Sequence, residues 1–489
     1  MNITFVNMRR EMYPLLGPAY LASYIKQYNY DVCITILDLA EGQMGRAAAK
    51  RILKTSPDVV AFTVFTVGVF DIIGVCKELK RLSPDISIWW GGPHITSVPH
   101  TLPPEVDVGV IGEGEETFCQ LCQEWIKHRP FSVDNLSAVE GVCFHTEQGM
   151  RIILPRKQIV PLDAIPAPEI SLLDMQWYTK PKKFFVMNRV LRGFVMMTSR
   201  GCPYRCTFCQ AAVHWNSCRY HSAERVITEL KRLREMFPKL NAVNIIDDLF
   251  IGNHQRLRDI VSLIRKQNLH DGMVFNVNGR ANLIDREILD LLKSINVIQI
   301  SYGFESGSER ILKFLKKGSV SVAQNYSAAE LTNEYGIGVG GQFMVGSLDE
   351  TENEMQETID FIKSHKMSHA HLSVTTPLPG TDLWDICKSK GIVSNDMDWR
   401  KLDFGNPCND DLLYIDKEIP QKHFKHLLLL AQDACDKWNS PVTLRDYLLY
   451  VESLTFKELL KRTMNKFCYI INKFFRLSAS IFKTAGKVK

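Results

Sequence analysis

The chain of 489 residues lacks two features that would place it in a membrane or outside the cell. It contains no run of 18 apolar residues, so the sequence predicts no membrane-spanning helix. The first seven residues, Met-Asn-Ile-Thr-Phe-Val-Asn, are typical of a short strand and not of the basic start of a secretory signal peptide. We therefore expect a cytoplasmic protein, which at this length should contain two or three domains.

The folded body also lacks the excess of positive charge that nucleic-acid binding would require. The net charge is +5, but residues 453–489 alone contain nine Lys or Arg residues and a single Glu. That segment carries +8, which leaves −3 for the rest of the chain. Hydrophobic residues make up 45% and charged residues 23%, which is typical of a soluble globular protein.

The 13 cysteines show no regular pairing that would indicate a disulfide framework, but three of them are closely spaced. Cys202, Cys206 and Cys209 form a C-x3-C-x2-C pattern within the run Gly-Cys-Pro-Tyr-Arg-Cys-Thr-Phe-Cys-Gln. Three thiolates on one short loop can ligate three irons of a four-iron cluster. Since no fourth cysteine follows in register, one iron would stay open for a substrate or cosubstrate.

A structural zinc site is the alternative interpretation of these cysteines. It would need a fourth ligand, which commonly comes from a second C-x2-C pair. Cys119 and Cys122 do have that spacing, but they lie in the predicted helix 117–128, where we expect them to be small core residues.

Residues 1–135 alternate between short apolar runs and helical patterns. The predicted strands are 3–6, 32–37, 59–64, 86–90 and 108–111, and the predicted helices are 18–27, 47–54, 70–82 and 117–128. This alternation predicts an α/β domain with a doubly wound, Rossmann-like parallel sheet. Ligands of such sheets bind at the carboxyl ends of the strands, where this sequence has repeated glycines. Ordinary turns would also explain those glycines.

A second alternation of strands and helices fills residues 191–390. The predicted strands are 195–198, 242–246, 274–277, 297–302, 341–345 and 372–375. Between the two series, residues 136–190 contain several prolines and predict a linker. After them, residues 391–489 predict a mostly helical region that shapes the substrate pocket, with a helix over 421–438 and a basic tail.

The cysteine spacing, with Phe208 just before the last cysteine, resembles the radical S-adenosylmethionine (radical SAM) superfamily. The resemblance continues for some 180 residues and implies a partial (β/α)6 barrel with its chemistry at the carboxyl ends of the strands. It also implies a four-iron four-sulfur (4Fe-4S) cluster on the three cysteines, with SAM bound to the open iron. Reduction of the cluster would then split SAM into methionine and a 5'-deoxyadenosyl radical.

The same resemblance implies a set of SAM contacts at the strand ends. Glu305 would accept hydrogen bonds from the ribose or the ammonium group, and Arg280 would pair with the carboxylate. Asp247 or its neighbour Asp248 lies where the family often places a contact. The full set of predicted SAM contacts is Phe208, Asp247, Arg280, Gly303, Glu305 and Ser306. Barrel-end acids and arginines that merely cap neighbouring helices are the alternative.

The glycine-rich strand ends of the first series resemble the cobalamin-binding domain of a large radical SAM subgroup. The residues that this implies as cobalamin contacts are Leu15, Gly17, Thr63, Thr66, Gly91, Gly92, Pro93, Gly112 and Glu113. Domains that give cobalt a histidine carry Asp-x-His-x-x-Gly after the first strand, but the loop here, residues 8–17, has no histidine. The lower face of cobalt would thus lack a protein imidazole. His94 is a possible substitute, although a loop role is more usual for a histidine in such a turn.

Together the two resemblances imply a cobalamin-dependent radical SAM enzyme, most of which are methyltransferases. Such an enzyme moves a methyl group from SAM, through methylcobalamin, to an unactivated carbon or phosphorus after hydrogen abstraction. A cyclase or oxidase of the anaerobic magnesium-protoporphyrin ester cyclase type is the second interpretation, and a cobalamin or redox sensor without turnover is the third. A reductant such as flavodoxin or ferredoxin is the implied partner, besides an unknown substrate.

The basic tail, residues 453–489, carries apolar and aromatic residues at mostly helical intervals among its lysines and arginines. A helix of this kind can lie in the headgroup region of an anionic membrane, which would make the protein membrane-peripheral. Packing of its apolar face on the barrel is the alternative.

Overall fold

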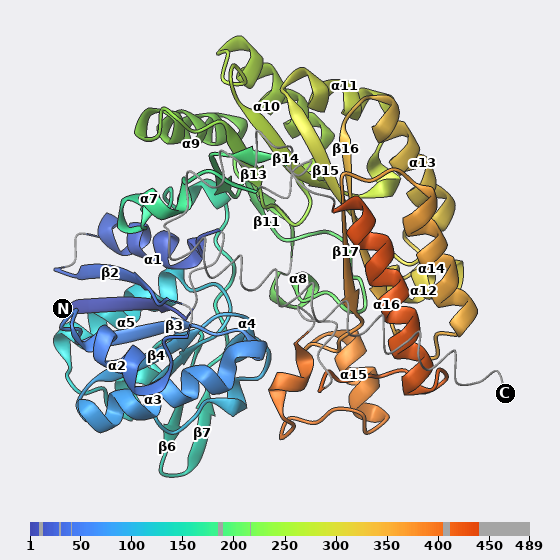
Figure 1. The fold of residues 1–489 in the computed structure, drawn as a ribbon. Helices are drawn as coiled ribbons and strands as arrows, with labels where there is room; N and C mark the ends of the chain where they lie inside the picture. Colours follow the sequence, from blue (N-terminus) through green and yellow to red (C-terminus); the bar gives the residue numbers. More distant parts are fainter. Residues whose placement is uncertain are drawn as a thin grey trace.

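The computed structural model describes residues 1–8, 13–28, 31–40, 42–183, 189–215, 217–403 and 411–439. Two large sheets organise these residues, one with seven strands and one with six, and helices cover both (Figure 1). The predicted α/β fold with two successive sheets is therefore confirmed. The predicted basic tail lies outside the described residues.

The first sheet has the strand order β2-β1-β3-β4-β5-β6-β7, and its first five strands are parallel. These strands are β1 (Asn2–Asn7), β2 (Cys33–Asp38), β3 (Val59–Thr63), β4 (Ser87–Gly91) and β5 (Val108–Val110). The helices of this half are α1 (Leu16–Gln27), α2 (Gly45–Leu53), α3 (Val69–Leu82), α4 (Pro93–Ser97), α5 (Glu115–Lys127) and α6 (Val133–Ser137).

Strand β4 illustrates why this sheet is covered on both faces. Trp89 and Trp90 are both fully buried, and successive side chains of a strand point to opposite faces. Trp89 packs with Phe118 of α5, while Trp90 belongs to the core that contains Ile72 of α3. The continuous apolar runs seen in the sequence thus reflect burial on two sides.

The segment 136–190, which we expected to be a linker, is partly built into the first domain. Strand β6 (Val142–Thr146) pairs antiparallel with β5, and β7 (Gly149–Ile152) pairs antiparallel with β6, so both extend the sheet. Further on, Leu162 and Ile165 pack in the same core as the second sheet. The short helix α7 (Met175–Tyr178) and the strand pair β8 (Lys182–Lys183) and β9 (Val190–Leu191) complete this stretch. Its prolines broke the periodicity on which the prediction depended.

The second sheet is a curled, open barrel of six parallel strands in chain order (Figure 1). Its strands are β10 (Gly193–Met196), β13 (Ala242–Ile245), β14 (Val274–Gly279), β15 (Val297–Glu305), β16 (Gly338–Val345) and β17 (His369–Val374). The helices around it are α9 (Ala223–Met236), α10 (His254–Lys266), α11 (Arg286–Ser294), α12 (Glu309–Lys316), α13 (Val322–Glu334) and α14 (Glu352–Ser364). The six predicted strands all appear.

Most barrel helices begin at a side chain that accepts a hydrogen bond from the first turn, which satisfies one of the free backbone N–H groups there. The capping residues are Ser222, Asn253, Asp285, Ser308, Ser321 and Thr351. These caps fix the residue at which each of these helices begins.

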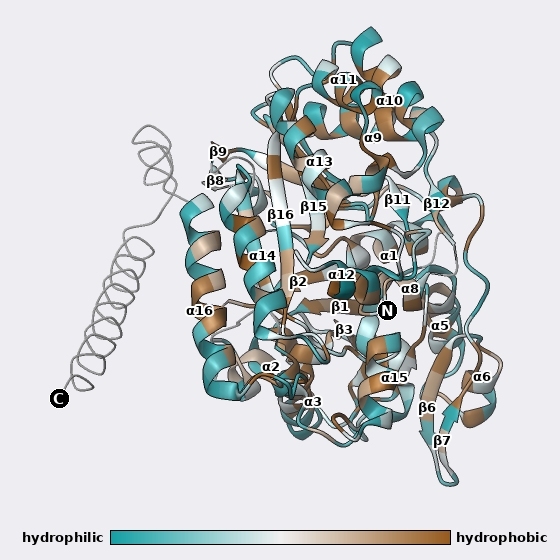
Figure 2. Cartoon of the chain, turned by 90° about the vertical axis from the view of Figure 1, so that its right-hand side faces the viewer, coloured by the Kyte–Doolittle hydropathy of each residue, from teal (hydrophilic) through white to brown (hydrophobic). Residues whose placement is uncertain are grey.

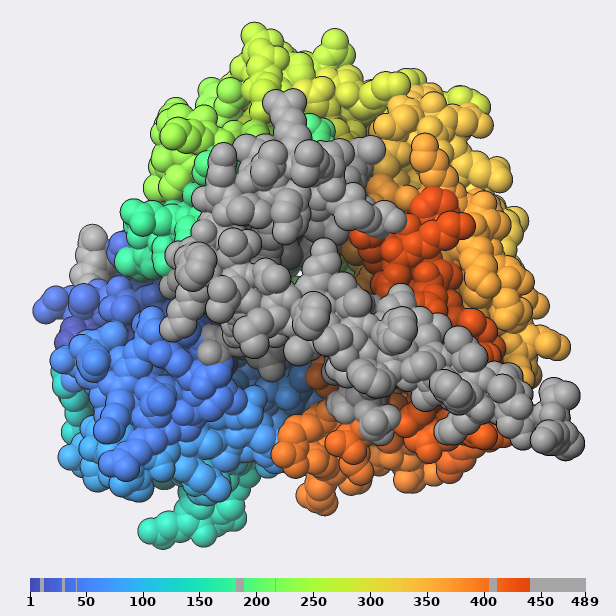
Figure 3. All heavy atoms as spheres, in the orientation of Figure 1, coloured from blue at the N-terminus to red at the C-terminus, as the bar shows by residue number. Residues whose placement is uncertain are grey.

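The C-terminal segment joins both halves of the molecule. Helix α15 (Asp382–Ser389) follows the last barrel strand, and α16 (Gln421–Trp438), predicted with these same bounds, packs on α14 and β17. Figure 2 shows the mixed apolar and polar faces of α16. Val393, Trp399 and Leu402 enter the core of the first sheet, and Figure 3 shows this part of the chain against the first domain. Among the described residues, no helix is long and apolar enough to cross a membrane.

Candidate cofactor site

The three cysteines of the C-x3-C-x2-C pattern lie on one loop between β11 (Ser199–Arg200) and α8 (Ala211–His214). All three are free, half-buried thiols. The middle of the loop is fixed to the barrel because Thr207 donates its backbone N–H to the Leu315 carbonyl at 3.0 Å and accepts from Leu383 N at 2.9 Å. Gly201 starts the loop at φ +89°, where a Cβ would lie 2.6 Å from the Ser217 carbonyl oxygen, so a larger residue would not fit.

The chemistry of this donor set fits an iron–sulfur cluster. Burial raises the pKa of Cys202 and raises that of Cys209 to about 11, so each thiol needs a cationic partner to lose its proton. Among the described residues, no three His, Cys, Asp or Glu side chains converge closely enough to hold a single metal ion. A cluster suits a wider spacing, because each thiolate binds a different iron.

The two aspartates after β13 have different surroundings. Asp247 is fully buried and accepts hydrogen bonds from Thr198 N and Oγ1, both at 2.5 Å, and from Ser199 N at 3.1 Å. These contacts make Asp247 a support for the cysteine loop, and its contact with SAM stays a prediction. Among the residues that the structure describes, Asp248 accepts a hydrogen bond only from Gly201 N, at 3.1 Å, and burial raises its pKa. It therefore borders the loop with acceptor capacity to spare.

Arg280, at the end of β14, lies directly beside the cysteine loop. Its guanidinium lies 3.7 Å from the centre of the Tyr204 ring, and one nitrogen is 3.8 Å from Cys206 Sγ. Another nitrogen donates to Ser319 Oγ at 2.5 Å. A positive charge so close to a cysteine sulfur would stabilise a thiolate or an anionic ligand of the open iron, as the sequence led us to expect.

Glu305, at the end of β15, forms a buried ion pair with Lys316 of α12 at 2.8 Å. Its φ of +63° is unusual for a residue with a side chain, and Gly303 leaves the room that the turned carboxylate occupies. The Lys316 ammonium lies 5.8 Å from the centre of the Phe208 ring. Phe208, Gly303 and Glu305, three of the predicted SAM contacts, thus lie close together, with Lys316 as an additional charge.

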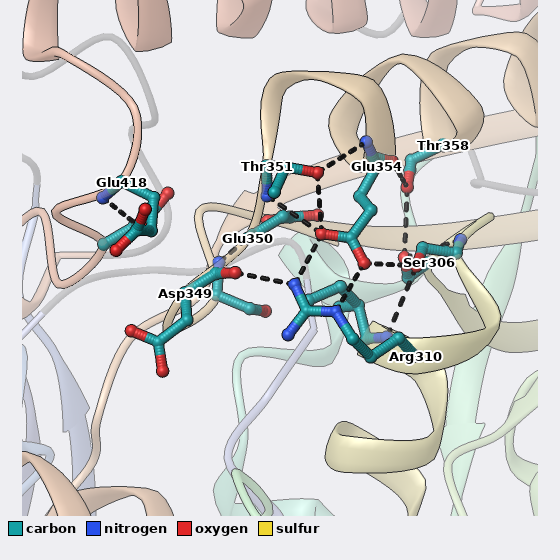
Figure 4. Close-up of polar contacts among 12 residues, drawn as sticks. Ser306, Arg310, Asp349, Glu350, Thr351, Glu354, Thr358 and Glu418 are labelled. Atoms are coloured by element: carbon teal, nitrogen blue, oxygen red, sulfur yellow. Dashed lines mark hydrogen bonds and ion pairs between the residues drawn. The ribbon is translucent and has the colours of Figure 1, made fainter.

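Ser306 does not join this group, although it follows Glu305 directly. It is fully buried, and its hydroxyl lies 3.1 Å from Thr358 Oγ1 of α14 and accepts from Ser308 N at 3.0 Å (Figure 4). The predicted SAM contact is therefore a scaffold residue at the start of α12. The neighbouring Arg310–Glu354 ion pair in the same view ties α12 to α14.

The predicted cobalamin contacts gather at the carboxyl edge of the first sheet. Gly91 ends β4 and is followed by Gly92 and Pro93, next to Thr63 at the end of β3 and Thr66 in the turn after it. Gly92 has φ +99°, and a Cβ there would lie 2.9 Å from Val64 N. Gly112 follows β5, and Leu15 and exposed Gly17 begin α1.

This edge fits a large, partly apolar ligand. Phe65, directly after β3, is 45% exposed although it is aromatic, and Gly17 has open space around it. Helix α4 at the same edge packs against α8, which follows the cysteine loop (Figure 1). The carboxyl edge of the first sheet, which we call the cobalamin edge after its predicted contacts, and the cysteine loop are therefore neighbours in space.

His94 is not available to cobalt. Its Nδ1 lies 3.2 Å from Thr66 Oγ1 and its Nε2 lies 3.0 Å from Thr101 Oγ1. The ring is buried edge-on to Trp399, and burial lowers its pKa to about 4. It is a structural residue of the loop, the role that is more usual for a histidine in this turn.

Glu113, another of the predicted cobalamin contacts, has a buried side chain that is held in ion pairs. Its carboxylate pairs with Arg200 at 2.6 Å and with Arg219 at 2.9 Å. Sequence reasoning missed these arginines, as it missed Lys316 and Tyr204. The only available signal was that Arg200 and Arg219 flank the cysteine loop, because nothing in the sequence marks acid partners some 90 residues earlier.

Comparison with known proteins agrees with this geometry. Residues 196–362 match the family model of the radical SAM superfamily, and residues 5–122 match that of the B12 binding domain. An uncharacterized methyltransferase of Pyrococcus horikoshii is 33% identical over 392 residues, which cover 79% of this chain and 81% of that protein. The anaerobic magnesium-protoporphyrin IX monomethyl ester cyclase of Rubrivivax gelatinosus is 27% identical over 408 residues, covering 81% and 69%.

Among solved structures, the cobalamin-dependent SAM radical enzyme OxsB, with aqua-cobalamin and SAM bound, has the same fold. The TM-score is 0.68 at 20% identity, over 92% of this chain and 70% of that one. The B12 binding match runs from β1 into α5 of the first domain, the radical SAM match runs from the end of β10 into α14 of the second, and the cysteine loop lies within the second match. The chain thus belongs to the radical SAM superfamily and is one of its members with a B12 binding domain.

Proposed function

We propose that this protein is a cobalamin-dependent radical SAM methyltransferase that acts on an unactivated carbon or phosphorus centre. The observation that carries the proposal is the contact between α4 and α8, which brings the glycine-rich edge of the first sheet next to the cysteine loop. A methyl carrier and a radical source would then share one reaction space. The similarity to the Pyrococcus methyltransferase supports the same reaction type.

The side chains divide into groups that would hold the separate cofactors. Cys202, Cys206 and Cys209 would ligate the cluster, while Arg280 and Asp248 would hold the polar end of SAM. Glu305 and Phe208 would border its nucleoside. The predicted edge residues other than Glu113 would hold cobalamin. When bound, the cluster and SAM supply a 5'-deoxyadenosyl radical, and cobalamin supplies the methyl group.

The protein's own contribution is charge and position. Arg280 places a cation 3.8 Å from Cys206 Sγ, where it also faces the open position of the loop. Asp248 orients Gly201 through one backbone hydrogen bond, and Lys316 fixes the orientation of the Glu305 carboxylate. Because the loop after β1 has no histidine in the sequence and His94 is fully hydrogen-bonded, the lower face of cobalt would receive no imidazole from either place.

The reaction type can be tested without knowing the substrate. The protein is loaded anaerobically with cluster and cobalamin, reduced, and incubated with SAM that carries a CD3 methyl group. We expect a CD3 group on the extracted cobalamin, measured by mass spectrometry, together with 5'-deoxyadenosine. Formation of 5'-deoxyadenosine without labelled cobalamin would contradict methyl transfer and favour the cyclase type, to which the Rubrivivax relative belongs. Formation of neither would favour a sensor.

Two aspects of the proposal concern partners. Reductive cleavage of SAM needs an electron donor, for which flavodoxin or ferredoxin is the proposed source. Peripheral membrane contact through residues 453–489 would suit a lipid substrate, and it is tested separately below.

A further inference from the structure

Four buried charged residues connect the first domain to the cysteine loop. Glu113 and Glu115 come from the end of β5 and the start of α5, and Arg200 and Arg219 come from β11 and β12 (Arg219–Tyr220). Arg200 donates to Glu113 at 2.6 Å and to Glu115 at 2.7 Å, and Arg219 donates to both oxygens of Glu113 at 2.9 and 3.0 Å. We refer to these four residues as the interdomain charge cluster.

The interdomain charge cluster is balanced and shielded from water. All four side chains are 5–6% exposed, and their two negative and two positive charges cancel. Burial alone would raise the pKa of Glu113, but the hydrogen bond from Arg219 and the charge of Arg200 lower it below its usual range. The backbone N–H of Ile159 also donates to Glu113 at 2.9 Å. Removal of one member would leave an uncompensated buried charge.

The position of the two arginines is the informative feature. Arg200 and Arg219 are directly opposite each other in the antiparallel β11–β12 pair, which closes the base of the loop that carries Cys202, Cys206 and Cys209. Glu113 therefore holds both strands of that base at once. Its backbone belongs to the strand end beside Gly112, at the cobalamin edge.

Adhesion between the domains does not depend on these charges. Leu16 and Tyr20 of α1 pack with Phe194 and Val195 of β10 in one continuous core, and the C-terminal segment adds a second apolar contact through Trp399. Apolar contacts tolerate small sliding movements, whereas a hydrogen-bonded charge cluster has one geometry. The interdomain charge cluster therefore adds a precise position of one domain relative to the other.

We propose that Glu113, Glu115, Arg200 and Arg219 are positioning residues that set the distance and orientation of the cysteine loop relative to the cobalamin edge. The inference rests on the proposed function only in that both cofactors bind where that proposal assigns them. It assigns Glu113 a role in the geometry between the two cofactors and none in the affinity for either.

The test uses Glu113→Gln, which keeps shape but removes the charge, in protein loaded with cluster and cobalamin. The protein is reduced so that the cluster and cobalamin each carry one unpaired electron. Pulsed electron paramagnetic resonance (EPR) then measures the distribution of distances between the two cofactors. We expect a single narrow distribution in the unaltered protein and one at least twice as broad in the variant, with both cofactors still stoichiometric. Glu354→Gln is the matched control, because Glu354 also binds an arginine, Arg310, but between α12 and α14 (Figure 4).

The outcomes are separable. An unchanged distribution in Glu113→Gln would overturn the positioning role, whereas failure of the unaltered protein to bind one cofactor would count against the proposed function. If Glu113→Gln does not fold, Glu115→Gln removes the charge of the carboxylate that Arg200 contacts through a single hydrogen bond, and it should broaden the distribution less. Hydrogen exchange of cofactor-free protein gives a second readout. Compared with the unaltered protein, amides of residues 199–220 should exchange at least tenfold faster in Glu113→Gln and at the same rate in Glu354→Gln. Equal exchange rates in Glu113→Gln and the unaltered protein would contradict the inference.

Discussion

The carboxyl edges of the two sheets differ in the types of residue that form them. The edge of the first sheet presents glycines, small hydroxyl residues and the exposed Phe65, while its charged neighbour Glu113 points into the protein. The edge of the barrel presents Arg280, Glu305, Lys316 and Asp248 around a loop of thiols. The first edge is thus suited to recognise shape, and the second to recognise charge. This difference matches a bulky macrocycle on one side and a zwitterionic cosubstrate with a cluster on the other.

The difference between the two sheet edges is tested most strongly at the three thiols of the cysteine loop. Simultaneous Cys→Ala replacement of Cys202, Cys206 and Cys209 should abolish the cluster and lower 5'-deoxyadenosine formation by about 10³-fold or more, because SAM cleavage needs the open iron. Mössbauer spectroscopy and product analysis measure the two effects. A full cluster in this variant would defeat the assignment. Cys119→Ala should change neither, since that buried thiol lies in α5, away from the loop.

The charged edge is tested next by Arg280→Met, which keeps the length of the side chain and removes its charge and donors. We expect SAM binding or cleavage to fall by about 10- to 100-fold while cobalamin binding is unchanged. Equilibrium binding of SAM to the cluster-loaded protein measures the effect. Loss of cobalamin binding by the same variant would show that the two edges do not act separately.

The shape-recognising edge is tested by Gly92→Ala. The φ of +99° lies in a region that is essentially restricted to glycine, and the added Cβ would press on Val64 N at 2.9 Å. Strain of about 1–3 kcal/mol at this loop should weaken cobalamin binding about tenfold or more. Titration with cobalamin followed by absorbance measures it. The cluster content should stay the same, and a parallel loss of iron would contradict a local effect.

A smaller effect is expected for the ligand on the lower face of cobalt. We expect the cob(II)alamin form to be base-off, with no nitrogen superhyperfine splitting in its EPR spectrum, because the residue 8–17 loop lacks histidine and both His94 nitrogens are engaged. His94→Gln should leave that spectrum unaltered. Nitrogen splitting that disappears in His94→Gln would instead identify this histidine as a ligand.

The smallest expected effect is that of the basic tail, which lies outside the described residues. Deletion of residues 453–489, with their net charge of +8, should reduce sedimentation with anionic liposomes severalfold and leave SAM cleavage unchanged. Neutral liposomes serve as the control. Equal binding of full-length and truncated protein, or none by either, would remove this argument for a lipid substrate.

The sequence predicted the elements of both sheets well because their strands are buried on both faces and produce unbroken apolar runs. Helix 421–438 was correct to the residue, since Pro420 precedes it and its apolar positions repeat regularly. The predicted linker failed in part because β7, which pairs antiparallel with the largely buried β6, is mostly exposed and has a weak apolar pattern.

At the site, the sequence predicted which residue types are present more reliably than it predicted where their side chains point. Asp247 and Asp248 are neighbours, yet only tertiary contacts show that the first supports Thr198 and Ser199. Glu305 and Ser306 diverge in the same way, because φ turns positive at Glu305 and the next residue points into the protein. Glu113 could not be assigned for a different reason: its partners lie 87 and 106 residues further along the chain.

The contribution of Val393, Trp399 and Leu402 to the core of the first sheet has a consequence for biosynthesis. The first domain receives part of its apolar wall from residues that are translated only after the whole barrel. Until then, Trp90 and the apolar side chains around it lack part of their cover. The nascent first domain is therefore a natural client for chaperones, and expressed alone as residues 1–135 it would expose an aggregation-prone surface.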